Sequence, residues 1–233
     1  MKITYHGHSA FQIDDEDIRL VIDPYITANE DCDQEASDMT DVSSVLVTHG
    51  AFDHLGDAPE IAEENDCKLI CDYATFSYLK KNGFPEKQLE PYIWGAKHYG
   101  EGWEAKIVEA HHQSVFIEEE ISGQAMGYIL DIGGEKIYHM GDTSIFGDIE
   151  LFGELYEPSV LLVPIGEAEG YFAELHPDEA ALATKWIDPD IAIPMHYPPE
   201  SDRLESFLNH CEDENIDKTT DIVSMKAGEE VTL

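Results

Sequence analysis

The sequence has few basic residues, and this shortage limits what the protein can bind. Lysine and arginine together number 13 among 233 residues, against 50 aspartates and glutamates, so the formal net charge is −37. A charge of this size repels nucleic acids and anionic membranes, and we expect neither as a partner. The only arginines are Arg19 and Arg203, which are too few to indicate a bidentate clamp for a phosphate group.

Long apolar stretches are also missing. No run reaches the roughly 18 residues of a transmembrane helix, and the first residues alternate like a strand rather than forming a signal peptide. We therefore expect a cytoplasmic protein. Its acidity has two interpretations: a merely acidic, soluble protein, or adaptation to a salty cytoplasm in which ions screen the self-repulsion. We favour the second interpretation, because so large an excess of one sign destabilises a compact chain without screening.

The sequence also has few cysteines and lacks two common catalytic motifs. Of the four cysteines, Cys67 and Cys71 have three residues between them in a strand-like segment, with no second pair to complete a zinc ribbon. We expect them to be free thiols in the core. The chain has no G-x-S-x-G sequence and no glycine-rich phosphate loop. A serine hydrolase of the nucleophile-elbow type and a P-loop enzyme are therefore excluded.

Hydrophobic periodicity predicts one layered α/β domain over residues 1–233. In each half, a series of strands is followed by alternating strands and helices, an order that suits two mixed sheets packed face to face with helices outside. The predicted strands are Lys2–His6, Ala10–Asp14, Ile18–Asp23, Ser44–Thr48, Lys68–Cys71, Trp103–Ala110, Gln124–Asp131, Glu135–Met140, Ser159–Pro164 and Ile191–Met195. The predicted helices are one starting near Ala58 and others at Thr75–Lys81, Pro177–Ile187 and Arg203–Cys211, while residues 27–41 form a loop.

Histidines and aspartates follow four of the apolar strands. A single histidine at a strand end is usually a half-buried, hydrogen-bonded side chain. Four strand ends with such residues are better explained by a metal site, because imidazole and carboxylate groups are ligands of zinc and other divalent ions. The segments are VLVTHGAFDHLGD (His49, Asp53, His54), IVEAHHQS (His111, His112), IYHMGDTS (His139, Asp142) and IAIPMHYPP (His196).

These motifs, in this order, resemble those of the metallo-β-lactamase superfamily. Residues 49–54 are similar to its H-x-H-x-D-H motif, with alanine in place of the second histidine. GHSAF (residues 7–11), A-x-H (110–112), GDT (141–143) and PMHY (194–197) are similar to the uncharacterised metal-dependent hydrolases related to ascorbate-6-phosphate lactonase. That branch also resembles N-acyl-phosphatidylethanolamine phospholipase D. The resemblance extends from Lys2 to Tyr197 and implies the four-layer αββα metallo-β-lactamase sandwich.

The resemblance also implies a set of metal ligands. His49 and His112 would bind a first metal, Asp53, His54 and His196 a second, and Asp142 would bridge the two. Asp53 would also orient the attacking water. We prefer His112 to His111 from the A-x-H match, and alternation along a strand points the two rings in opposite directions.

Five further histidines are secondary candidates. His139 lies close to the GDT motif, and we expect it to orient a ligand. His8 lines the site or is structural. His176, just before Pro177, either faces the pocket as a catalytic residue or is a plain helix N-terminal residue. His6 is a possible substitute ligand, as are His8 and His111.

Ala51 is where the chain departs from the motif. Without a histidine there, the first metal keeps His49, His112 and the bridging Asp142 among the expected ligands. Catalytic zinc sites operate with three protein ligands and a water, so the site is weakened rather than lost. We therefore expect a divalent metal, zinc or manganese, with one firm site and one site weakened by Ala51.

Together these features predict a metal-dependent hydrolase in which a metal-bound water attacks a small-molecule substrate. A small ester or lactone is the first choice, by analogy with the family alone. A phosphodiesterase is the alternative enzyme. A family member that binds a metal or ligand without catalysis is the alternative outside enzymes, and Ala51 is the argument for it.

Overall fold

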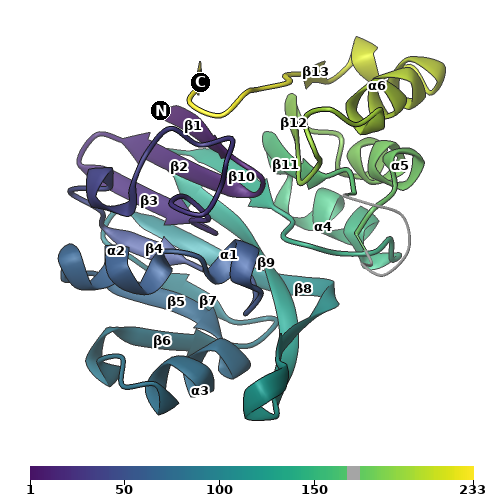
Figure 1. Cartoon of the computed structure of the whole chain (residues 1–233). Helices are drawn as coiled ribbons and strands as arrows, with labels where there is room; N and C mark the ends of the chain where they lie inside the picture. Colours follow the sequence, from purple (N-terminus) through teal and green to yellow (C-terminus); the bar gives the residue numbers. More distant parts are fainter. Residues whose placement is uncertain (167–173) are drawn as a thin grey trace. The chain divides into compact units, whose positions relative to one another are not determined.

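A computed structural model of the chain describes residues 1–166 and 174–233. In these residues the strands form two seven-stranded mixed sheets (Figure 1). The chain divides into two compact units, each containing most of one sheet. Unit 1 comprises Met1–Ala96, Gln113–Met126 and Met225–Leu233, and unit 2 comprises Lys97–His112 and Gly127–Ser224.

The sheet of unit 1 begins as an antiparallel meander and continues as parallel strands. Its strand order is β14-β1-β2-β3-β4-β5-β6, antiparallel from β14 to β3 and parallel from β3 to β6. The parallel strands end at the same edge of the sheet, which is where polar residues follow them. The strands are β1 (Lys2–Gly7), β2 (Ala10–Asp15), β3 (Ile18–Ile22), β4 (Ser44–Leu46), β5 (Lys68–Asp72), β6 (Leu89–Tyr92) and β14 (Glu230–Thr232).

Three helices accompany this sheet: α1 (Phe52–Leu55), α2 (Ala58–Glu64) and α3 (Tyr73–Lys81). Proline fits the first turn of α2 because its missing N–H would have no helical partner there. Asp72 caps α3 by accepting a hydrogen bond from the Ala74 N–H at 2.7 Å. Apolar side chains of α2 and α3 pack with those of β4 and β5 in one buried cluster. The cluster contains Cys67 and Cys71, and burial raises the pKa of the Cys67 thiol to about 11.

The sheet of unit 2 has the order β13-β12-β11-β10-β9-β8-β7. Strands β10 to β13 are parallel, so they too end at one edge. The outer ends of β8 and β9, residues 113–126, belong to unit 1. The strands are β7 (Lys97–Tyr99), β8 (Trp103–Phe116), β9 (Ile121–Ile132), β10 (Glu135–His139), β11 (Val160–Pro164), β12 (Ile191–Met195) and β13 (Asp221–Ile222).

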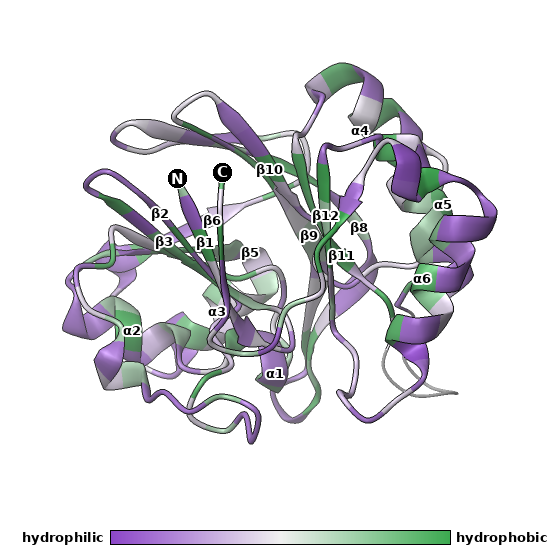
Figure 2. Cartoon of the chain, turned by 90° about the horizontal axis from the view of Figure 1, so that it is seen from above, coloured by the Kyte–Doolittle hydropathy of each residue, from purple (hydrophilic) through white to green (hydrophobic). Residues whose placement is uncertain are grey.

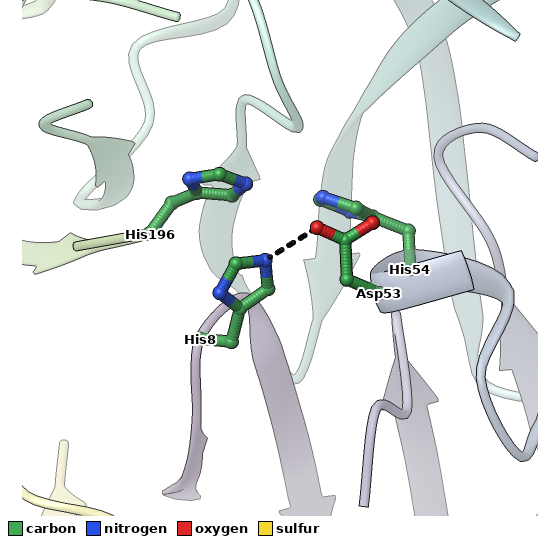
Figure 3. Close-up of side chains that lie close together, drawn as sticks. All are labelled: His8, Asp53, His54 and His196. Atoms are coloured by element: carbon green, nitrogen blue, oxygen red, sulfur yellow. Dashed lines mark hydrogen bonds and ion pairs between the residues drawn. The ribbon is translucent and has the colours of Figure 1, made fainter. Parts of the chain in front are cut away.

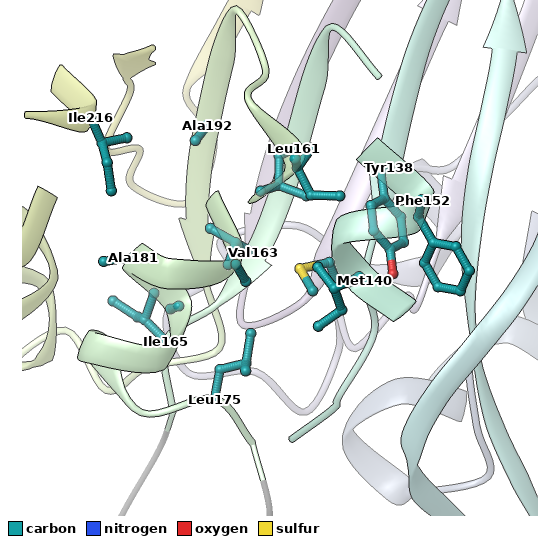
Figure 4. Packing of buried hydrophobic residues seen from close by; sticks show 14 of the residues in the cluster. Tyr138, Met140, Phe152, Leu161, Val163, Ile165, Leu175, Ala181, Ala192 and Ile216 are labelled. Carbon is teal, nitrogen blue, oxygen red and sulfur yellow. The ribbon is translucent and has the colours of Figure 1, made fainter. Parts of the chain in front are cut away.

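Helices α4 (Asp148–Tyr156), α5 (Pro177–Ile187) and α6 (Arg203–Asp213) cover this second sheet. Their apolar faces join Leu161, Val163 and Ala192 of the strands in one core (Figure 4). Figure 2 shows hydrophilic residues on the other faces of α5 and α6, as expected for amphipathic helices at a surface. Within the part of the chain that is described, no helix is long and apolar enough to cross a membrane.

The observed elements agree with most of those predicted and differ in a few. Helix Pro177–Ile187 and strand Ile191–Met195 have the predicted bounds. Strand β8 runs to Phe116 rather than ending at Ala110, because the polar residues after Ala110 continue the alternation in a long strand. Helices α1 and α4 and the short strands β6, β7, β13 and β14 were not predicted; each is short and bounded by residues typical of turns. All four cysteines are free, as expected.

Candidate functional site

Unit 1 gathers ligand-type side chains where β4 ends. His49 follows this strand, and the short helix α1 carries Asp53 and His54 on consecutive residues. His8 comes from the turn between β1 and β2 and places its Nε2 atom 3.2 Å from Oδ2 of Asp53 (Figure 3). The donor atoms of His8, Asp53 and His54 lie within 4.8 Å of one another, and those of His49 and His54 are equally close. Both His49 and His54 are fully buried.

A buried aspartate orients His54. Asp23 follows β3, and its Oδ2 atom accepts a hydrogen bond from His54 Nδ1 at 2.8 Å. Thr48 holds the same carboxylate through its backbone N–H and its hydroxyl, each at 2.7 Å. Because Nδ1 of His54 carries the proton, Nε2 is the nitrogen that is left to bind a metal. Sequence reasoning missed Asp23, although it too is a polar residue directly after an apolar strand.

Residues of β8 hold the loop between His49 and Asp53 in place. The Gly50 N–H donates to the Ser114 hydroxyl at 2.8 Å, and that hydroxyl donates to the Asp72 carboxylate at 2.9 Å. A Cβ atom on residue 50 would lie 2.2 Å from the Phe116 ring, so any larger residue would have to displace that ring. The tip of β8 therefore holds the backbone that carries the HGAFDH motif.

Unit 2 carries a second cluster, made of His112, Asp142, Glu174 and His196. His112 lies on β8, Asp142 follows β10, His196 follows β12 and Glu174 precedes α5. The donor atoms of His112, Asp142 and Glu174 lie within 4.8 Å of one another. His196 Nε2 lies 3.2 Å from Oδ2 of Asp142. Asp142, Glu174 and His196 are buried, so the cluster contains two carboxylates with little access to solvent.

The GDT motif of unit 2 is held by its neighbours. Nδ1 of the buried His139 accepts a hydrogen bond from the Gly141 N–H at 3.1 Å. Gly141 has a φ of +63°, a conformation that glycine adopts without strain. The Thr143 hydroxyl accepts from the His111 N–H at 2.9 Å. His139 thus contacts the turn that carries Asp142, and its role in orienting a ligand stays a prediction.

Three residues of these clusters and their supports have left-handed backbone. His8, Asp23 and His196 have φ values of 55°, 46° and 56°. This region is uncommon for residues other than glycine and costs free energy, on the order of 1 kcal/mol for each. Such conformations persist where the surroundings impose them, and they gather at functional sites. Their presence in both units supports a functional role for these strand ends.

Three of the secondary histidine candidates lie outside the clusters found among the described residues. His6 is buried in β1, and burial lowers its pKa to about 4, so it is neutral at physiological pH. His111 is exposed and stacks on Phe146, with ring centroids 4.0 Å apart. His176 is an exposed residue at the N-terminus of α5, with Nδ1 3.3 Å from Nη1 of Arg203. The catalytic role of His176 stays a prediction.

The chemistry of both clusters fits a divalent metal. Ligands bound about 2.0–2.2 Å from one ion lie within roughly 4.4 Å of each other, and the clustered donor atoms are about this close. Neutral imidazole and carboxylate are the groups that bind zinc and manganese. A buried carboxylate pair also requires compensation by positive charge, which a cation supplies.

Proteins with similar sequences place the chain in a family. The model of the β-lactamase superfamily domain matches residues 18–197. A UPF0173 metal-dependent hydrolase from Methanopyrus kandleri is 37% identical and covers 98% of each chain. The chain belongs to the metallo-β-lactamase superfamily. The predicted class of metal-dependent hydrolase is thereby confirmed, because the relatives of the chain carry that name.

Solved structures with the same fold agree. Igni18, a metallo hydrolase from Ignicoccus hospitalis, is 29% identical with a TM-score of 0.83, covering 100% of this chain and 97% of that one. The metallo-β-lactamase fold protein YhfI from Bacillus subtilis has a TM-score of 0.71 at 12% identity, covering 99% of this chain and 98% of that one. The chain therefore has the metallo-β-lactamase fold that its motifs predicted.

Proposed function

We propose that the chain hydrolyses a small ester or lactone with the help of divalent metal held by the six ligands implied by its motifs. These are His49, Asp53, His54, His112, Asp142 and His196. The observation that carries the proposal is the contact of His54 with Asp23, at 2.8 Å between Nδ1 and Oδ2. A carboxylate behind a histidine fixes the tautomer and the ring direction of a metal ligand, and raises its basicity.

Each ligand has a distinct part in this proposal. His49 and His112 would hold a first metal, His54, Asp53 and His196 a second, and Asp142 would be shared by both. A divalent ion would supply Lewis-acid chemistry there, lowering the pKa of water to about 7 and polarising the oxygen of the scissile bond. Water then adds across the acyl C–O bond, so an ester yields an acid and an alcohol and a lactone yields one hydroxy acid.

Asp53 and His8 act on the attacking water in this scheme. The Asp53 carboxylate accepts a hydrogen bond from the water and orients it toward the carbonyl carbon. His8, whose Nε2 atom is 3.2 Å from Oδ2 of Asp53, holds that carboxylate in position. His176 remains the candidate for contact with the substrate, since it is exposed at the start of α5.

The charge distribution favours a substrate of low negative charge. One of the two arginines, Arg203, is close to His176, while the other, Arg19, is bonded to Asp14 at 2.7 Å. With a net charge of −37, the chain repels polyanions at long range. Small esters and lactones are therefore better candidates than phosphodiesters or nucleic acids.

Turnover by the purified protein tests the proposal. The chain, purified without chelator, is assayed with matched panels of lactones, carboxylic esters and phosphodiesters in added Mn²⁺ or Zn²⁺. We expect hydrolysis of a lactone or ester that a chelator abolishes and metal restores. Turnover of the phosphodiesters alone would identify the chain as a phosphodiesterase. Bound metal without turnover on any panel would favour a binding protein.

We also infer that the acidic surface is an adaptation to a cytoplasm of high salt concentration. Several of the few lysines form surface ion pairs, such as Lys185 with Glu214 and Lys80 with Glu86, both at 2.8 Å. Such pairs neutralise only a small part of the acidic excess. The remaining carboxylates repel one another, and dissolved cations screen that repulsion.

A further inference from the structure

Glu174 occupies a fixed position in unit 2. The next residue, Leu175, is fully buried in the core that α4, α5 and the second sheet share (Figure 4). Gly166, which follows β11, has a φ of +80°, and a Cβ atom there would lie 2.9 Å from the Leu175 carbonyl oxygen. Glycine therefore lets the segment before α5 pass close to the end of β11, and this contact sets the position of Glu174.

The side chain of Glu174 joins two expected metal ligands. One of its carboxylate oxygens lies within 4.8 Å of the ligand atoms of both His112 and Asp142. Glutamate is seldom buried unless it is paired or binds a metal, yet Glu174 is only 6% exposed. The strand-end pattern gave no reason to single it out, because Glu174 follows no strand directly.

Two buried carboxylates this close repel each other strongly. Asp142 is only 3% exposed, so water screens the repulsion poorly. His196 contacts Asp142 at 3.2 Å and supplies at most one positive charge. A divalent cation balances both carboxylates and uses their oxygens as ligands.

We propose that Glu174 is a metal ligand together with His112 and Asp142 of the same unit. The inference rests on the proposed function, in which His112 and Asp142 bind the first metal. Glu174 would add a third ligand to these two, so that unit 2 alone offers three groups to one ion.

A second carboxylate in the ligand set also changes which metal the site prefers. Oxygen ligands suit manganese and magnesium, whereas imidazole suits zinc. A first site with two carboxylates therefore discriminates less strongly in favour of zinc than the histidine-rich site of the family motif. The ratio of the zinc and manganese dissociation constants measures this preference directly.

Calorimetric titration of the full chain, stripped of metal, with Mn²⁺ and with Zn²⁺ tests the proposal. We expect wild type to bind two ions per chain. Glu174→Gln should weaken one of them by about 100-fold or more, because losing even an outer partner of a ligand costs about 10–100-fold. Glu174→His, which offers an imidazole in place of the carboxylate, should keep that ion and shift the preference toward Zn²⁺. Asp178→Asn, an exposed change of equal charge in the same segment, is the control and should bind as wild type does.

The outcomes separate this inference from the proposed function. Wild type that binds no Mn²⁺ or Zn²⁺ even at millimolar concentration overturns both. Unchanged binding in Glu174→Gln, together with loss of binding in Asp142→Ala, overturns the role of Glu174 alone. Loss of binding in Glu174→Gln that is equally large in Glu174→His indicates a structural role and also overturns it. Should Glu174→Gln not fold, Glu174→His must still bind two ions with a higher preference for Zn²⁺.

Discussion

The two units present clusters of opposite character. The cluster of unit 1, His8, His49, Asp53 and His54, has three imidazoles and one carboxylate, and hydrogen bonds from outside the cluster hold it. The cluster of unit 2, His112, Asp142, Glu174 and His196, has two imidazoles and two carboxylates, most of them buried. Hydrogen bonds from other protein groups position the ligands of the first cluster, whereas the second cluster carries negative charge that a bound cation would balance.

This difference indicates in which unit a bound metal contributes most to stability. In unit 1, Asp23 and Thr48 orient His54, so protein groups set the geometry of this ligand. In unit 2, the proximity of Asp142 and Glu174 costs free energy until a cation arrives. Metal binding should therefore stabilise unit 2 more than unit 1.

The largest effect should come from the bridging carboxylate. Asp142→Ala removes a ligand that both metals share in the proposed site, so metal content and any hydrolysis should fall to background. His196→Ala should behave similarly. Metal content per chain, measured by mass spectrometry after purification without chelator, checks both.

Cys67→Ala is the control for these variants. This buried thiol lies in the core of unit 1 and belongs to none of the candidate clusters found in the described residues. It should retain the full metal content. Equal metal content in wild type and Asp142→Ala would show that the ligand assignment is wrong.

A smaller effect should follow when the orientation of His54 is disturbed. Asp23→Asn keeps the size of the side chain but replaces the carboxylate that accepts from His54 Nδ1. Affinity for the metal of His54 should fall about 10–100-fold, the usual result of losing such a partner. Titration of metal-free protein with Zn²⁺ measures it, and a variant that binds as tightly as wild type would remove the observation on which the proposed function depends.

Much of the fold could be predicted from the sequence because its strands and helices are strongly patterned. Pro177 at the start of α5 and the apolar run before His196 mark elements whose bounds agree with prediction. Strand β8 was underestimated because residues 111–114 are polar, although the strand continues through them to Phe116. The short strand β14 was missed because three residues carry too little periodicity to detect.

The site was predictable where ligands follow strands, and less so elsewhere. His49 and Asp142 directly follow apolar segments, so the pattern drew attention to them. Asp23 satisfies the same rule but was counted as the end of its strand. Glu174 could not be found, since its burial depends on Leu175 and on the close approach at Gly166. These are tertiary contacts that local sequence does not express.

Salt should change the stability of both units. Its effect should therefore show whether charge repulsion is confined to the cluster of unit 2. If the acidic surface is an adaptation to salt, molar KCl should raise the melting temperature of metal-free protein by about 5–10 °C, corresponding to roughly 2–3 kcal/mol for a chain of this size. Glu174→Gln should show the same rise, because one buried charge is a small part of −37. A melting temperature that does not change with salt would contradict the adaptation.

The smallest effect concerns a buried hydroxyl in the core of unit 2. Asp23 and Asp72 in unit 1 accept several hydrogen bonds each, whereas the Tyr138 hydroxyl is buried without a hydrogen-bond partner among the described residues. Tyr138→Phe should therefore stabilise the protein by about 1 kcal/mol at neutral pH, or about 2–4 °C in melting temperature.

Burial raises the pKa of Tyr138 well above its ordinary value of 10.0. The unfolded chain therefore releases this proton near pH 10 while the folded chain retains it, and wild type loses stability as pH rises above that point. The advantage of Tyr138→Phe should widen between pH 9 and 11 in thermal melts, and an advantage that shrinks over this range would show that the folded protein ionises Tyr138 readily.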